Sequence, residues 1–270
     1  MISDVTPPAE RGRAYGFHRA LDHTGAIVGP LLAIALLQGL HFTLRQVMWF
    51  AVIPGSIGAL MLFAMLKDEG GKTKDEASKP HPASVIPHPS STTFRRAITA
   101  ISLFSLANSS DAFLLLQAHA AGVSTSMLPA LWAAHHVIKS AFSTRAGALS
   151  DRVDRRYLLI AGWLSYAVIY ILFPFAHTLT TFVILFVAYA IPFTLSEGAE
   201  RAWIADLVPP EARGKSFGVY YLANGLCVLA GTALFGLIYE RVSAQAAFFT
   251  GAAFAIVAAI SVSSVKVARE

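Results

Sequence analysis

The sequence contains few charged residues and almost no cysteine. Only 14% of its 270 residues are Asp, Glu, Lys or Arg, whereas 55% are hydrophobic and the mean hydropathy is +0.58. Soluble globular domains carry about 25% charged residues, so this composition excludes that class and predicts an integral membrane protein. The lone Cys227 excludes an intrachain disulfide, and we interpret it as a small packing residue.

The sequence is instead rich in long apolar runs. Eight stretches reach about 20 residues, the length that a helix needs to cross roughly 30 Å of hydrocarbon. Backbone groups in lipid must pair within their own segment, so we expect an all-α, polytopic membrane helical bundle. The predicted spans are 14–37, 46–66, 97–121, 127–147, 157–175, 180–199, 217–239 and 244–265.

Basic residues gather on one side of this predicted topology, and only Arg45 and Arg241 lie on the other. The positive-inside rule therefore puts both termini in the cytoplasm, and we expect a bacterial inner membrane as the location. The basic loops are short and lack interleaved aromatic residues, so nucleic acid is not expected as a partner. The basic residues of the richer side are Arg11, Arg13, Lys67, Lys72, Lys74, Lys79, Arg95, Arg96, Arg145, Arg152, Arg155, Arg156, Arg213, Lys215, Lys266 and Arg269.

The start of the chain is repeated near its end. The stretch ISDVTPPAERGRAYG matches IADLVPPEARGKSFG at residues 204–218 without a gap. The register aligns Asp4 with Asp206, and the matching pairs continue with Arg11 and Arg213, Asp22 and Asn224, and Gly29 and Gly231. Two duplicated membrane halves with substrate handled between them are a recurring plan of transporters.

The two halves defined by this repeat differ in length. Four predicted spans precede the second copy within its half, whereas none precedes the first copy. We therefore interpret residues 1–66 as the remnant of an N-terminal half, with two helices equivalent to its fifth and sixth. Residues 97–270 form a C-terminal half of six helices. The missing helices, or an oligomeric partner, are expected to complete the first half; a gene fragment and a genuine short form both remain open.

Residues 67–96 join the halves and are rich in Lys, Pro, Ser and Gly. Such a composition predicts a disordered cytoplasmic linker. Two histidines of the linker, His81 and His88, each precede a proline and have no Cys or carboxylate at ligand spacing. Neither a metal nor a cofactor is expected.

The loop between the fourth and fifth spans, GALSDRVDRRYLL, resembles the cytoplasmic loop signature G-x-L-a-D-r-x-G-r-R of the major facilitator superfamily. Asp154 stands where that family prefers glycine, and Asp tolerates the left-handed conformation better than most residues. The resemblance implies a transporter whose halves rock around a central site, with Asp151 as a gate latch. Asp151 can pair with an arginine and can cap a neighbouring helix. The matching residues are Gly147, Leu149, Asp151, Arg152, Arg155 and Arg156.

The first predicted helix carries ionisable groups close to its start. At 100° per residue, His18 and Asp22 share a stripe with Gly25 and Gly29, whose spacing predicts close helix packing. Arg19 and Pro30 lie on the adjoining stripe. The run GAIVGP is similar to half of the antiporter motif G-x-x-x-G-P-x-x-G-G of the superfamily, which favours efflux over uptake. Intramembrane charges are functional candidates, so Asp22 is predicted to carry a proton, although an interfacial cluster is the alternative.

The second half contains further ionisable groups. Asn108 and Asp111 share one side of the third span, and His135 and Lys139 form a stripe on the fourth. Asp111 is a second candidate proton carrier with Lys139 as its cationic partner, or else the two form a static ion pair. Glu197 and Arg201 are four residues apart in the order that favours an intrahelical salt bridge near the cytoplasm.

These observations predict a secondary active transporter of the major facilitator type, moving a small molecule across the lipid bilayer with protons. The alternative is a truncated fragment or assembly subunit that transports nothing alone. A membrane-embedded enzyme using His135, His136 and Asp111 is the third reading, but the sequence lacks a nucleophile with a nearby base and a catalytic loop.

Overall fold

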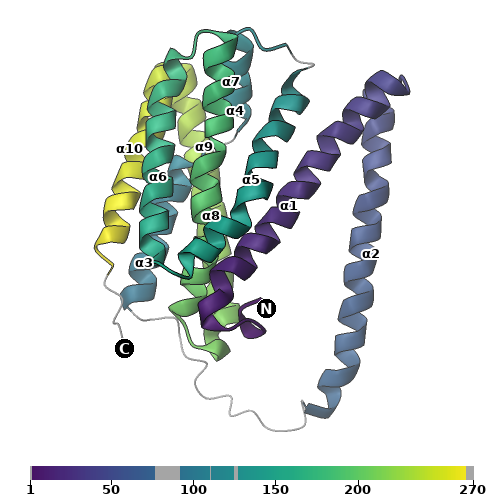
Figure 1. The fold of residues 1–270 in the computed structure, drawn as a ribbon, viewed down its shortest axis with the longest axis vertical. Coiled ribbons are helices and arrows are strands. Elements are labelled where there is room, and N and C mark those ends of the chain that lie inside the picture. Colours follow the sequence, from purple (N-terminus) through teal and green to yellow (C-terminus); the bar gives the residue numbers. More distant parts are fainter. Residues whose placement is uncertain (1, 77–91, 110, 125–126, 266–270) are drawn as a thin grey trace.

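The computed structural model describes residues 2–76, 92–109, 111–124 and 127–265, and regular structure within these ranges is helical (Figure 1). Short 3₁₀ turns at Ile2–Asp4, Pro8–Glu10, Phe173–Phe175 and Pro210–Ala212 and a π-helical turn at Ala35–Gly39 flank the longer elements. The α-helices are α1 (Arg11–Ile34), α2 (Leu44–Glu76), α3 (Thr92–Ala107), α4 (Ala112–Ala120), α5 (Leu128–Ser150), α6 (Arg155–Leu172), α7 (Leu179–Ala188), α8 (Ala190–Asp206), α9 (Arg213–Arg241) and α10 (Ala244–Ser263).

The predicted all-α membrane bundle is confirmed. In the described ranges, seven helical segments are long and apolar enough to cross a membrane: Pro8–Gly39, Leu44–Met61, Thr92–Ala120, Arg155–Phe175, Leu179–Asp206, Pro210–Arg241 and Ala244–Ser263. The remaining predicted span, 127–147, corresponds to α5, which has 23 residues but is interrupted by Lys139 and Arg145. At 1.5 Å per residue α5 is about 35 Å long, enough to cross the hydrocarbon core.

Two predicted spans are broken helices. The predicted span 97–121 is divided into α3 and α4, with Asn108 and Ser109 outside either helix. Both side chains compete with the backbone for hydrogen bonds, and Ser109 Oγ lies 3.1 Å from the Tyr170 hydroxyl. The predicted span 180–199 is divided at Tyr189, because Pro192 has no N–H to donate to the carbonyl four residues earlier, where α7 ends.

The predicted disordered linker is partly helical. Helix α2 continues to Glu76 and α3 begins at Thr92, so residues 67–76 and 92–96 extend the neighbouring helices instead. Propagation of an existing helix adds one hydrogen bond for each residue that becomes fixed, which favours such extensions. Residues 77–91, with His81 and His88, lie outside the described residues, as do Lys266 and Arg269.

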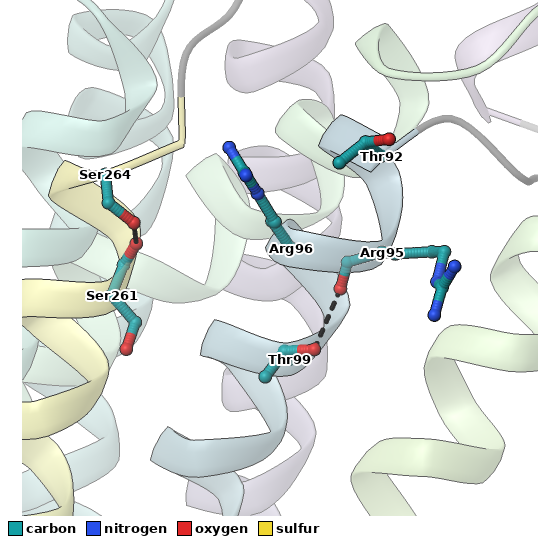
Figure 2. Close-up of a pocket in the computed structure, with 6 residues that line it drawn as sticks. All are labelled: Thr92, Arg95, Arg96, Thr99, Ser261 and Ser264. Atoms are coloured by element: carbon teal, nitrogen blue, oxygen red, sulfur yellow. Dashed lines mark hydrogen bonds between the residues drawn. The ribbon is translucent and has the colours of Figure 1, made fainter.

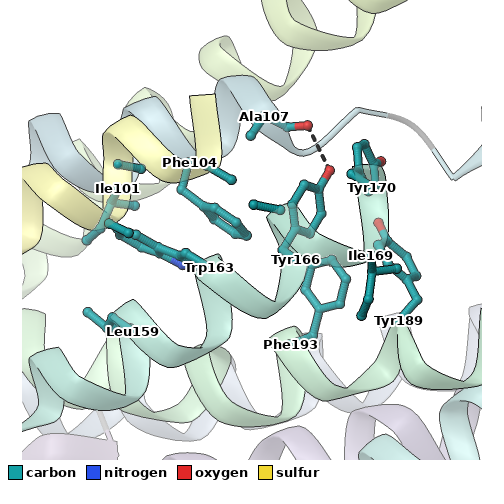
Figure 3. Packing of buried hydrophobic residues seen from close by; sticks show 14 of the residues in the cluster. Ile101, Phe104, Ala107, Leu159, Trp163, Tyr166, Ile169, Tyr170, Tyr189 and Phe193 are labelled. Carbon is teal, nitrogen blue, oxygen red and sulfur yellow. Dashed lines mark hydrogen bonds between the residues drawn. The ribbon is translucent and has the colours of Figure 1, made fainter. Parts of the chain in front are cut away.

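The core lies within the second half, among α3, α6, α8 and α10 (Figure 3). The rings of Phe104 and Trp163 stack with centroids 4.8 Å apart, and those of Tyr166 and Tyr170 with centroids 4.1 Å apart. The Tyr166 hydroxyl donates to the Ala107 carbonyl at 2.7 Å, at the end of α3. These aromatic contacts position the broken end of α3 against α6.

Helix α1 packs along α5 and α8, whereas α2 stands apart from the other helices (Figure 1). None of the apolar window Leu44–Met61 in α2 is buried. We call the interface of α1 with α5 and α8 the seam, because it joins the first repeat copy to the second half.

Candidate functional site at the seam

Glycines form the closest contact of the seam. A Cβ at Gly12 would lie 2.4 Å from the Gly147 carbonyl oxygen, and one at Gly16 would lie 2.4 Å from the Ser143 carbonyl oxygen. Gly198 of α8 lies against Gly16 as well. Sequence analysis missed Gly12 and Gly16, although their G-x-x-x-G spacing is a known signal for close helix packing.

The predicted close packing at Gly25 and Gly29 is not observed. A Cβ at either position would meet no described atom within 4 Å. Pro30 lies inside α1. Gly25 and Gly29 are exposed and, at 100° per residue, lie on the face of α1 that points away from the seam.

Asp151 closes the seam at the start of α1. Its two carboxylate oxygens accept hydrogen bonds from the backbone N–H groups of Gly12 (2.7 Å) and Arg13 (2.8 Å), while Arg155 lies 3.1 Å away. The carboxylate thus caps the positive end of α1 from the other half, as the loop resemblance implied for Asp151.

Two ion pairs join the repeat copies crosswise. Arg11 pairs with Asp206 at 2.7 Å, and its repeat counterpart Arg213 pairs with Asp4 at 3.0 Å. Asp206 also accepts from Arg155 at 2.8 Å. Each copy therefore supplies the arginine for the aspartate of the other copy. We call Asp4, Arg11, Asp151, Arg155, Asp206 and Arg213 the latch.

The other signature residues lie beside the latch. Arg156 pairs with Asp154 at 2.5 Å and also donates to the Val265 carbonyl, while Arg152 is exposed. Asp154 does not adopt the left-handed conformation, since its φ is −60°; its side chain accepts from Arg156 N and caps α6. The residue that replaces glycine is thus a helix cap.

A buried ionic cluster lies deeper in the seam. Lys139 of α5 donates to Glu197 Oε1 at 2.9 Å, whereas Arg19 and His23 of α1 bind Oε2, the latter at 3.1 Å. His23 Nδ1 faces His136 Nδ1 at 3.2 Å. We call Arg19, His23, His136, Lys139 and Glu197 the seam cluster.

Two predicted ion pairs are replaced by contacts of this cluster. Lys139 pairs with Glu197 and not with Asp111, which accepts from the Tyr189 hydroxyl at 3.1 Å. Glu197 takes its partners from α1 and α5, and no described ion pair joins it to Arg201. The intrahelical spacing predicted a partner on the same helix, but burial favours cations that neighbouring helices bring to the carboxylate.

Asp22 lies at the edge of the cluster. It is 3.0 Å from Arg19 and 3.5 Å from His18, and its side chain is 44% exposed. These contacts correspond to the interfacial alternative rather than to an enclosed proton site.

Two cavities meet at Glu197. A cavity of about 580 Å³ is bordered by Asp111, Trp132, His135, Lys139 and Thr232, and a smaller one of about 170 Å³ by Arg19, Glu200, Arg201, Tyr220 and Asn224. Asn108, Phe193 and Glu197 line both. His135 is held by the Phe186 carbonyl at 3.2 Å. The larger cavity is of the size that small-molecule sites have.

A further pocket, of about 610 Å³, lies away from the seam, between the first turns of α3 and the end of α10 (Figure 2). Arg95, Arg96 and hydroxyl side chains line it, and Thr99 Oγ1 donates to the Arg95 carbonyl at 3.0 Å. The described residues contain no group of three His, Cys, Asp or Glu side chains placed to hold a metal ion.

A duplicated helical membrane protein with a latched seam and a cavity behind it has the architecture of a transporter. The family model of the Major Facilitator Superfamily matches residues 1–138 and 113–269. The chain belongs to this superfamily, whose members are transporters rather than enzymes.

The chain is also similar to known proteins and to a solved structure. The chain is 24% identical over 265 residues to an uncharacterized MFS-type transporter of Methanocaldococcus jannaschii, covering 96% of this chain and 65% of that protein. It is 23% identical over 249 residues to an uncharacterized protein of Mycobacterium tuberculosis, covering 89% and 59%. The crystal structure of the human organic anion transporter TETRAN is similar with a TM-score of 0.70 and 16% identity, covering 97% of this chain and 66% of that one. The chain thus spans less than two thirds of the length of these relatives.

Proposed function

We propose that this chain acts in a secondary active transporter that moves a small organic molecule through the seam by alternating access. The observation that carries the proposal is the position of the larger cavity behind the latch. Asp151, Asp206 and their partners hold one end of the seam closed, while the 580 Å³ cavity lies behind the seam cluster and is lined by its Lys139 and Glu197. Breaking these polar contacts at one end and forming others is how rocking halves expose a central site alternately.

We propose protons as the driving ion and efflux as the direction. Asp111 borders the cavity beside Lys139 and His135, so a substrate or proton that binds there meets ionisable groups. Asp22 is retained as a second candidate from its place on α1. The half motif with Gly25, Gly29 and Pro30 supports efflux. The basic loops support cytoplasmic termini in a bacterial inner membrane.

The test is transport by the purified chain in proteoliposomes with an imposed pH gradient. The panel should include organic anions, because the similar human structure is that of an organic anion transporter, and amphipathic cations. Accumulation that collapses with the pH gradient is expected. Asp111→Asn should abolish gradient-driven accumulation while the protein stays folded. Full accumulation by this variant would remove Asp111 from the coupling mechanism, and the absence of transport for the whole panel would contradict the proposal.

A second candidate function is that of a subunit that transports only with additional helices. The observation that favours it is the apolar surface of α2, whose window Leu44–Met61 has no buried residue. Mass measurement of the native complex separates the two: a monomer that transports contradicts the subunit function, and a larger assembly that is required for transport supports it.

A further inference from the structure

The two oxygens of Glu197 are held by different halves of the molecule. Oε1 accepts from Lys139, which belongs to the second half like Glu197 itself. The described partners of Oε2, Arg19 and His23, both belong to α1. Separation of α1 from α5 and α8 therefore removes every described partner of one oxygen and leaves the other oxygen paired.

This contact lies well inside the seam. Arg19 follows Gly12 by seven residues, which places it about 10 Å further along α1 than the latch. The side chains of Glu197, Arg19 and His23 are 17%, 19% and 4% exposed, so the cluster is largely buried while the latch holds. Parting of the seam from the latch end must separate this cluster before the cavity can open on that side.

Nearby cations favour the ionised form of a carboxylate, so a carboxylate that loses cationic partners is protonated more easily. In the closed seam Arg19, His23 and Lys139 surround Glu197 and favour its ionised form. In the open seam Lys139 remains and the two partners from α1 are removed. Protonation of Glu197 is therefore more favourable in the open seam than in the closed seam.

We propose that Glu197 takes up the coupling proton when α1 parts from α5 and α8, and releases it when Arg19 and His23 return. The proposal rests on the proposed function, because it names the proton site of the same seam. It adds a proton site to the candidates Asp22 and Asp111, at a residue whose helical spacing had predicted a salt bridge with Arg201.

The other carboxylates near the cavity lack this dependence on the seam. Glu200 accepts from Tyr220 at 2.7 Å, and Asp111 accepts from Tyr189. Both hydroxyls belong to the second half, so these contacts persist whether or not α1 moves. Glu200 therefore serves as the matched control, a carboxylate three residues from Glu197 on the same helix.

Several titratable or charged groups face Glu197 from the surrounding elements, and a pH experiment must separate their effects. The groups are Arg19, Asp22 and His23 of α1, Asp111 next to α4, His135, His136 and Lys139 of α5, Glu200 and Arg201 of α8, and Tyr220 of α9. Single substitutions of Glu197 and Glu200 in one background make this separation.

The experiment measures seam opening without a substrate. Spin labels at Ala9→Cys and Tyr157→Cys, both exposed at the latch end, report the distance between α6 and the 3₁₀ turn that leads into α1, in a Cys227→Ser background. In lipid nanodiscs the open fraction of the full chain should rise as pH falls from about 8 to about 5, by up to tenfold for each pH unit if one proton is taken up. Glu197→Gln should be largely open and independent of pH, whereas Glu200→Gln should follow the parent.

A second variant, Arg19→Gln, tests the proposal even if Glu197→Gln fails to fold. Arg19→Gln keeps the carboxylate but removes one α1 partner, so its opening should occur at a higher pH than in the parent. An unchanged pH profile in Glu197→Gln, or an unchanged midpoint in Arg19→Gln, overturns the proposal. A parent whose distance does not depend on pH also overturns it. The absence of transport for the whole panel would instead contradict the proposed function, because seam opening is measured independently.

Discussion

The two copies of the repeat differ in which of their aligned glycines are closely packed. Gly12 of the first copy is packed against Gly147, whereas its counterpart Gly214 has open space around its Cβ position. Further along, Gly29 has open space, whereas its counterpart Gly231 would place a Cβ 2.3 Å from the Leu106 carbonyl oxygen. The first copy is tight where it meets the other half, and the second copy is tight within its own half. The sequence of a copy thus specifies a helix, and its neighbours decide which face is used.

The largest effect is expected from substitution at Gly29 and Gly231, the aligned glycines that lie further from the latch. Gly231→Ala should lower the free energy of unfolding by about 1–3 kcal/mol, since the new methyl group meets backbone atoms that cannot move aside. Gly29→Ala should leave stability unchanged or raise it by up to about 1 kcal/mol, because alanine favours helix. Thermal unfolding in detergent measures both. Equal effects would mean that the two copies have equivalent surroundings.

The glycines near the latch should give the reverse order. Gly12→Ala places a methyl group 2.4 Å from the Gly147 carbonyl oxygen. Overpacking of this kind costs about 1–3 kcal/mol, so the seam should open by several ångströms to relieve the clash. Gly214→Ala should leave the seam closed. The spin-label distance between Ala9→Cys and Tyr157→Cys measures the effect, and a closed seam in Gly12→Ala would contradict it.

The crosswise ion pairs should also be unequal. Asp206 binds two arginines and its side chain is 32% exposed, whereas Asp4 pairs with Arg213 and is 42% exposed. Asp206→Asn should destabilise the closed seam by about 1–3 kcal/mol and Asp4→Asn by about 0.2–1 kcal/mol. The open fraction in the same distance measurement tests the order. A larger effect of Asp4→Asn would show that exposure is not what weakens a latch pair.

The smallest effect is expected at Asp22, whose counterpart is Asn224. Asp22 has contacts only with Arg19 and His18 among the described ion pairs, and such exposed pairs contribute at most about 1 kcal/mol. Asp22→Asn should therefore retain the pH dependence of seam opening. Loss of that dependence would return the proton site to Asp22 and away from Glu197.

Sequence patterns predicted the helices and the loop signature well, because both are local. Apolar runs located α6 and α10 to within a few residues, and GALSDRVDRR drew attention to Asp151, which accepts a hydrogen bond from Gly12 N at the start of α1. The repeat is visible when the chain is compared with itself, and it aligns Arg11 with Arg213 from the sequence alone.

Contacts between distant helices could not be predicted in the same way. Arg19 and Glu197 are 178 residues apart, and no spacing rule joins them. The spacing of Glu197 and Arg201 pointed to a partner on α8, since helical periodicity describes only the helix itself. The breaks at Asn108 and Tyr189 were missed because hydropathy reports neither the contact of Ser109 with the Tyr170 hydroxyl nor the backbone N–H that Pro192 lacks.

The crosswise pairing of Arg11 with Asp206 and of Arg213 with Asp4 has an evolutionary consequence. Duplicated segments normally diverge freely once one copy retains the original role. Here a charge lost from one copy removes an ion pair from the other, and a compensating mutation must arise there and not next to the first. The two copies are therefore expected to coevolve, so that substitutions at these four positions occur as matched changes across the halves.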